Sequence, residues 1–157
     1  MKRIRPVSIF LLGVLFLTYA PAEAQKRKKR KQIAEVVTEA RKYLGVPYRY
    51  GGMSFSGIDC SALIYACYRR IDVDMPRTAK EQSKVGKAKS WNGLREGDLV
   101  FFKFKEKGQK WYHSGVITEV KGDEIIFIHA SSSRGVTESN LMSDYYRKNV
   151  KNFRRII

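Results

Sequence analysis

The sequence is poor in the residues that build covalent frameworks and metal centres. Its 157 residues include two cysteines and two histidines. Such low numbers argue against a disulfide framework and against most metal sites that need several ligands. The sequence also has no G-x-S-x-G elbow, no P-loop, no G-x-G-x-x-G motif and no internal repeat. Any cysteine or histidine chemistry must therefore use Cys60, Cys67, His113 and His129.

Acidic residues are also scarce. Asp and Glu together number 15 against 31 Lys and Arg, which gives a formal charge of +16. Apolar residues make up 43% of the chain, enough for a real core, and the length suits one compact domain rather than two. Together these numbers predict a single basic globular domain.

The N-terminus has the layout of a secretory signal peptide. Three basic residues lie within Met1–Pro6, an apolar run follows over Val7–Ala20, and Ala22-Glu23-Ala24 is a small-x-small cleavage pattern. An uncleaved membrane anchor is the alternative, but the run of 14 residues is shorter than the roughly 20 needed to span a bilayer. We therefore predict that residues 1–24 export the protein across the inner membrane, to a periplasmic or extracellular location.

A cationic segment follows the expected cleavage point. Residues 25–32 contain six consecutive basic residues, and the chain without residues 1–24 keeps a charge of +14. Such a run repels itself, so we predict a basic flexible tail ahead of a domain over 33–157. Because the segment follows a signal peptide, we expect its partner to be an anionic envelope surface, contacted non-specifically, rather than nucleic acid. A solvated tail with no specific partner is the alternative.

The order of the predicted elements indicates the fold class. A helix over residues 33–44 precedes Gly45 and Pro47, and Asp59 suits the N-cap of a buried helix over 60–71. A Thr-x-x-Glu capping box predicts a short helix from residue 78. Strand patterns follow at 98–104, 113–120, 124–130, 135–139 and 153–157. Helices first and adjacent strands later predict an α+β domain with an antiparallel sheet.

The positions of the two cysteines in the predicted helix indicate different roles. Cys60 lies in the first turn of the predicted helix, where the helix dipole favours an anion and should lower the thiol pKa. Cys67 lies two turns further on, and the pair is about 10 Å apart in an intact helix, beyond the limit of about 7 Å for a disulfide. A buried, inert thiol is the alternative for each, and it suits Cys67 best.

A cysteine nucleophile needs a base, and the base needs an orienting group. A three-residue turn over 121–123 would place His113 opposite Ser131, with His129 one diagonal step away on the same face. A two-residue turn would put the histidines on opposite faces. Two unrelated histidines are the other reading. The Cys-x6-Cys and His-x15-His spacings match no common zinc pattern, and no metal or other cofactor is expected.

Five motifs, in order, resemble the NlpC/P60 family. They run over residues 43–52, 56–64, 94–102, 113–117 and 127–133, and the similarity covers about residues 33–157. The resemblance implies a papain-like fold, in which N-terminal helices pack on an antiparallel sheet with the nucleophile at a helix N-terminus. It also implies cysteine peptidase activity on bacterial peptidoglycan.

The family's site residues carry over one by one. Its nucleophile matches Cys60, its base His113 and its orienting polar residue His129. The tyrosine that helps hold the oxyanion matches Tyr48, although an ordinary half-buried aromatic is the alternative. The acid and hydroxyl residues that flank the nucleophile, and that grip a free substrate amine in some members, match Asp59 and Ser61. Asp59 could instead be only a helix cap.

Two features depart from the family pattern. Ala62 stands where many members have glycine, a tolerable change because alanine favours helix. The segment over residues 103–112, ahead of the expected base, contains four lysines and is hydrophilic. We expect it to form a rim loop near the cleft.

The resulting expectation is an exported cysteine endopeptidase that cuts peptidoglycan peptides through an acyl-enzyme. The motif similarity favours the D-alanyl–diamino acid bond of a cross-link over the γ-D-glutamyl–diamino acid bond of a stem. An amidase or acyltransferase on the same scaffold is a further reading. From another class, the charge would suit a non-catalytic cationic envelope-binding protein.

Overall fold

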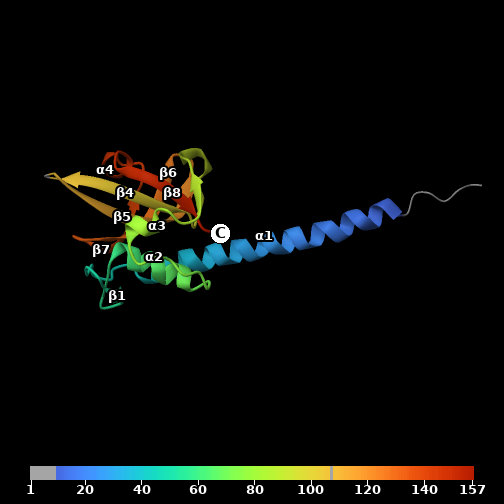
Figure 1. Cartoon of the computed structure of the whole chain (residues 1–157), viewed down its shortest axis with the longest axis horizontal. Helices are drawn as coiled ribbons and strands as arrows, with labels where there is room; N and C mark the ends of the chain where they lie inside the picture. The colour runs from blue at the N-terminus through green and yellow to red at the C-terminus, as the bar shows by residue number, and fades with distance from the viewer. Residues whose placement is uncertain (1–9, 107) are drawn as a thin grey trace, which may run out of the picture.

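The computed structural model describes residues 10–106 and 108–157 of the chain. Its helices are α1 (Phe10–Lys42), α2 (Cys60–Arg69), α3 (Ala79–Gln82) and α4 (Asp144–Arg147), with a 3-10 turn, η1, at Trp91–Gly93. Its strands are β1 (Met53–Ser54), β2 (Gly57–Ile58), β3 (Lys87–Lys89), β4 (Leu99–Glu106), β5 (Gln109–Lys121), β6 (Glu124–Ser131), β7 (Gly135–Asn140) and β8 (Val150–Arg155). Helix α1 extends away from the body as a long rod (Figure 1).

The main sheet has six strands in the order β3-β8-β4-β5-β6-β7. Every pair in it is antiparallel, as the succession of predicted strands suggested. Strands β1 and β2 form a separate small hairpin. The end of α1 and the whole of α2 pack together and against the sheet, so the α+β prediction is confirmed.

Strand alternation gives the sheet two buried faces. Leu99 and Phe101 join the core beneath α1 and α2, whereas Val100, Phe102 and Phe104 join a second core on the other face. Both sets are nearly inaccessible to solvent. Since α2 carries Cys60 at its start, this packing fixes the nucleophile candidate against a rigid sheet.

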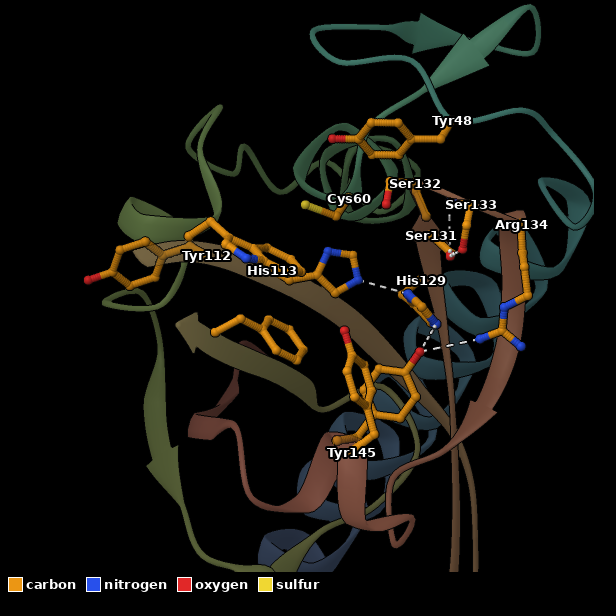
Figure 2. Close-up of a pocket in the computed structure, with 14 residues that line it drawn as sticks. Tyr48, Cys60, Tyr112, His113, His129, Ser131, Ser132, Ser133, Arg134 and Tyr145 are labelled. Carbon is orange, nitrogen blue, oxygen red and sulfur yellow. Dashed lines mark hydrogen bonds between the residues drawn. The ribbon is translucent and has the colours of Figure 1, made fainter. Parts of the chain in front are cut away.

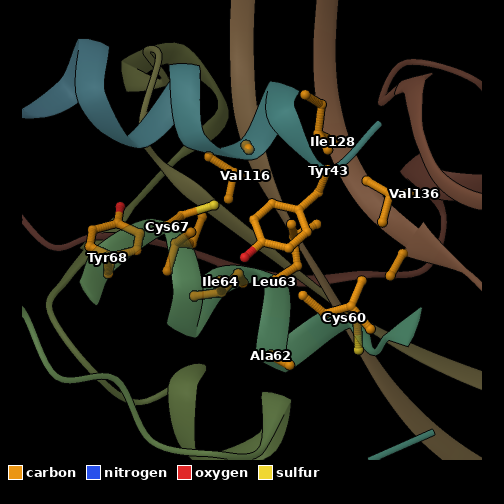
Figure 3. Close-up of a cluster of buried hydrophobic side chains, with 14 of the residues drawn as sticks. Tyr43, Cys60, Ala62, Leu63, Ile64, Cys67, Tyr68, Val116, Ile128 and Val136 are labelled. Atoms are coloured by element: carbon orange, nitrogen blue, oxygen red, sulfur yellow. The ribbon is translucent and has the colours of Figure 1, made fainter. Parts of the chain in front are cut away.

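Helix α2 begins where the sequence predicted. The Asp59 side chain accepts a hydrogen bond from the Ala62 backbone N–H, which makes it the N-cap. The Thr78 cap of α3 is also confirmed, because its Oγ1 accepts from the Glu81 N–H at 3.3 Å. Cys67 lies deeper along α2 among apolar side chains, with Cys60 at the other end of the helix (Figure 3).

The β5–β6 hairpin has the shorter of the two turns considered, yet His113 and His129 still lie on the same face of the sheet. Lys121 pairs with Glu124, so the turn has two residues rather than three. The register then shifts between Ile117 and Glu119, and Val116 pairs with Ile128. This bulge adds one residue to β5 and reverses the effect of the shorter turn. His113 and His129 therefore lie on the same face, as the longer turn would have placed them.

The hydrophilic segment over residues 103–112 is not a rim loop. Residues 103–106 and 109–112 form the ends of β4 and β5, in which Lys103 pairs with Tyr112 and Phe104 with Trp111. The lysines alternate with aromatic residues, which is a strand pattern that the high lysine content hides. The rings of Phe104 and Trp111 stack with centroids 4.3 Å apart.

Residues 25–32 are helical rather than a flexible tail. They lie within α1, which continues into the packed part of that helix. Lys, Arg and Gln favour helix, and Glu23–Arg27 and Lys31–Glu35 form i,i+4 ion pairs along it. Part of the expected signal peptide, residues 1–9, lies outside the described residues. No helix in the described part of the chain is long and apolar enough to cross a membrane.

Candidate active site

Cys60 lies at the junction of two pockets. One pocket of about 430 Å³ also contains His113 and His129, and the other, of about 570 Å³, contains Asp59 and Ser61. The aromatic residues Tyr48, Trp111 and Tyr112 line both pockets together with Cys60. Cys60 is 9% exposed whereas Cys67 is fully buried, so only the first thiol faces a cavity.

The environment of Cys60 differs from our expectation in one respect. We expected the helix N-terminus to lower its thiol pKa, but burial raises that pKa. The hydroxyl and backbone of Ser114 act in the opposite direction without overcoming it. Before substrate enters, the thiol therefore keeps its proton at neutral pH, and a base must remove it for Cys60 to attack.

The two histidines form a direct pair. Nε2 of His113 lies 2.8 Å from Nδ1 of His129. Burial lowers the pKa of His113 to about 4. Burial, with smaller contributions from His113 and Arg134, lowers the pKa of His129 to about 3. Both rings are consequently neutral near pH 7, and His113 is able to accept a proton.

The hydrogen-bond chain indicates which tautomer suits that role. Figure 2 shows the second nitrogen of His113 on the side of its ring where Cys60 lies. For this Nδ1 to accept a proton, Nε2 must carry the hydrogen and donate it to His129. His129 then donates from Nε2 to Ser139 Oγ at 3.0 Å or to the Tyr146 hydroxyl at 3.1 Å. Each ring thus fixes the orientation of the next.

Aromatic packing holds both imidazoles. The ring of Phe127 stacks on His129 at a centroid distance of 4.8 Å, and Phe102 lies 6.0 Å from His113. Gly115 permits this packing, because a Cβ there would lie 2.6 Å from the Phe127 ring and 2.8 Å from the Ile128 carbonyl oxygen. The glycine in the His113-Ser114-Gly115 motif is therefore a packing requirement.

Tyr48 is held above the same cavity by backbone pairing. The Ile58 N–H donates to the Pro47 carbonyl at 3.1 Å, and the Arg49 N–H donates to the Ile58 carbonyl at 3.2 Å. Burial raises the pKa of Tyr48, with smaller contributions from Cys60 and Asp59. Its hydroxyl therefore stays protonated and can donate a hydrogen bond near Cys60.

Asp59 is more than a helix cap. Its Oδ1 accepts from Ser61 Oγ at 3.0 Å, and Arg77 donates to both carboxylate oxygens, at 3.0 and 2.7 Å. Oδ2 also accepts from the Gly51 N–H at 3.0 Å. Burial opposes the charged carboxylate, but these hydrogen bonds and the Arg77 charge lower its pKa overall. A substrate amine would have to compete with Arg77 for this carboxylate.

The sequence analysis missed several members of the site. Arg77 lies 18 residues from Asp59 and is brought to it because Gln82 donates to the carbonyls of Ser61 and Pro76. Ser139 could have been found from the β6–β7 register, since it lies two residues from the partner of His129. No local pattern singled out Arg134 or Tyr146, which reach the histidines through a turn and a short helix.

Comparison with known proteins agrees with the fold. The model of the NlpC/P60 family matches residues 45–155. The probable endopeptidase NlpC of Escherichia coli is 36% identical over 150 residues, which cover 95% of this chain and 94% of that protein. The murein DD-endopeptidase MepS/murein LD-carboxypeptidase of the same species is 33% identical over 79% of this chain and 63% of its own.

Solved structures show the same architecture. An NLP/P60 family protein from Staphylococcus aureus, described as similar to lipoprotein, has a TM-score of 0.68 at 30% identity, over 81% of this chain and 42% of that one. The family model covers well over half of the chain, and its range contains Cys60, His113 and His129. The protein belongs to the NlpC/P60 family.

Proposed function

We propose that the protein is an exported cysteine endopeptidase that hydrolyses peptide bonds in bacterial peptidoglycan. The observation that carries this proposal is the juxtaposition of Cys60 with the hydrogen-bonded pair His113–His129 in one cavity. Family membership and relatives named as endopeptidases and a murein endopeptidase support the substrate class. Residues 1–24 act as the signal peptide in this proposal.

The reaction begins with proton transfer. His113 Nδ1 takes the Cys60 proton as the sulfur attacks the scissile carbonyl, and His129 holds the imidazolium that forms. The Cys60 backbone N–H and the Tyr48 hydroxyl stabilise the oxyanion. Collapse of the intermediate breaks the C–N bond, and His113 returns the proton to the leaving amine. Water, deprotonated by His113, then releases the acyl group as a carboxylic acid and regenerates the thiol.

The second pocket receives the acyl portion of the substrate in this scheme. Asp59 and Ser61 line it, and Arg77 neutralises the carboxylate. Of the two bonds under consideration, we favour the D-alanyl–diamino acid cross-link, with the γ-D-glutamyl–diamino acid bond as the alternative. The exposed basic residues 26–31 of α1 would add non-specific attraction to an anionic envelope surface.

The test is digestion of purified peptidoglycan with identification of the fragments by mass spectrometry. We expect Cys60→Ala to lower the rate at least about 10³-fold, since the nucleophile is lost. The matched control is Cys67→Ala on the same helix, which should keep activity within about threefold and lose about 1 kcal/mol of stability through a small cavity. Normal digestion by Cys60→Ala would contradict the proposal.

The same experiment with purified peptidoglycan distinguishes the enzyme from the rival function, a cationic envelope-binding protein. If the protein binds peptidoglycan without releasing fragments, and binding falls as salt rises, then charge explains the interaction. The enzyme proposal instead requires fragments that accumulate with time and depend on Cys60.

A further inference from the structure

In the proposed reaction, the two pockets that meet at Cys60 bind opposite sides of the scissile bond. In the proposed reaction His113 protonates the leaving amine, so the amine side of the scissile bond must lie beside this ring. His113 and His129 line the 430 Å³ pocket and are not among the described residues that line the other. The residue that donates the leaving amine therefore occupies the pocket walled by the histidines. In both candidate bonds that residue is the diamino acid.

Arg134, in the turn between β6 and β7, lines this pocket, with its guanidinium on the side of His129 away from Cys60 (Figure 2). The following residue, Gly135, has a φ of +70°, and a Cβ there would lie 2.5 Å from the Val46 carbonyl oxygen. The Val136 N–H also donates to that carbonyl at 2.8 Å. The turn is thus fixed against the segment that leads to Tyr48, so Arg134 has a defined place at the rim.

The partners of Arg134 differ from those of Arg69, Arg77 and Arg155. Arg77 binds Asp59 at 2.7 Å, Arg155 binds Asp98 at 2.6 Å and Arg69 binds Asp74 at 2.6 Å. Within the described residues, Arg134 has no carboxylate at ion-pair distance. Its contacts are neutral hydroxyls at the long distances of 3.3 Å (Ser139) and 3.4 Å (Tyr146).

The rest of the pocket leaves this charge unopposed. Its described lining consists of aromatic side chains, Cys60, the two neutral histidines, Ala130 and three serines, and it includes no Asp or Glu. A guanidinium offers a planar pair of donors that matches a carboxylate. An anionic group on the leaving residue would therefore find a single, geometrically suited partner.

We propose that Arg134 binds a free carboxylate on the diamino acid at the amine side of the scissile bond, and so selects diamino dicarboxylic acids over lysine-like or amidated residues. This inference rests on the proposed function. It adds a specificity-determining residue in the pocket opposite Asp59, where the resemblance placed none. Arg134 could otherwise serve only to orient Ser139 and Tyr146 behind His129, and the experiment separates these roles.

The experiment measures kcat/KM of the full chain on three synthetic peptides that share the bond cut by the wild type. The first has a diamino dicarboxylic acid with its carboxylate free, the second has that group as a carboxamide, and the third has lysine in its place. The variants are Arg134→Gln and Arg134→Lys. Arg147→Gln, an exposed arginine on α4 outside the pocket lining, is the matched control.

We expect the wild type to prefer the carboxylate peptide about 10- to 100-fold, the worth of a charge-assisted hydrogen bond. Arg134→Gln should lose that factor, so that its kcat/KM on the carboxylate peptide falls to its value on the carboxamide peptide. Arg134→Lys should retain part of the preference, and Arg147→Gln all of it.

Equal rates of the wild type on the carboxylate and carboxamide peptides would overturn the inference without any variant. An equal loss by Arg134→Gln on both peptides would also overturn it, because that result describes a residue that only positions His129. If the folded wild type cuts none of the peptides and releases nothing from peptidoglycan, the proposed function itself fails and the inference falls with it.

Discussion

At the scale of single residues, burial decides the protonation of the site. A helix N-terminus is expected to favour a thiolate, yet burial raises the pKa of Cys60 and lowers that of His113. Both changes favour the neutral pair of thiol and imidazole. The resting site is therefore ready for proton transfer on attack, rather than holding a permanent ion pair.

This protonation state predicts the acid limb of the pH–rate profile. His113 can act as a base only while it is unprotonated, and its pKa of about 4 means that this condition holds from neutral pH down to about pH 5. As pH falls through about 4 the ring gains a proton and the rate should fall with it. The measurement is kcat/KM between pH 3.5 and 8, with circular dichroism at each pH to exclude unfolding.

A different acid limb in the pH–rate profile would contradict this protonation state. An acid limb with a midpoint near 6.5, the ordinary value for histidine, would mean that His113 is solvated rather than buried. Such a profile would contradict the packing of its ring among Phe102, Phe104 and Trp111.

At the scale of elements, the β5–β6 hairpin assembles the base. The two-residue turn alone would place the histidines on opposite faces, and the bulge next to Ile117 restores their common face. Below them, Phe127 fills the space that Gly115 leaves open and supports His129. Site geometry thus depends on packing between neighbouring strands as well as on the histidines themselves.

Gly115→Ala tests this dependence. The added methyl would meet the Phe127 ring at 2.6 Å in a packed core, so we expect a loss of about 1–3 kcal/mol in the free energy of unfolding, together with lower activity. Gly93→Ala is the matched control, since a Cβ there meets nothing within 4 Å, and its stability should change by less than about 0.5 kcal/mol. Urea denaturation compares the two, and equal midpoints would show that Gly115 is not a packing requirement.

At the scale of the whole molecule, the features encoded in short stretches were predictable. Asp59 as a cap, Cys60 in the first turn of α2 and the succession of antiparallel strands all follow from local spacing. The sheet order and the Arg77–Asp59 pair do not, because they join segments that are distant in the sequence.

Two features could not be derived from local spacing, each for a physical reason. Turn length alone could not decide whether His113 and His129 share a face, because the bulge in β5 also sets the register and has no signal in the sequence. The basic segment over residues 25–32 was assigned to a flexible tail because charge repulsion was weighed without the helix that follows. Continuity with the packed end of α1 and i,i+4 ion pairs favour helix there.

Alkylation of the folded protein with iodoacetamide, with label and activity followed together, tests directly whether Cys60 is the nucleophile. Cys60 lines both pockets, with the base His113 in one of them, whereas Cys67 is fully buried and lines neither pocket. We expect one carboxamidomethyl group, mapped to Cys60 by mass spectrometry, with peptidoglycan digestion lost in proportion to labelling. Full labelling of Cys60 with digestion unchanged would show that this thiol is not the nucleophile.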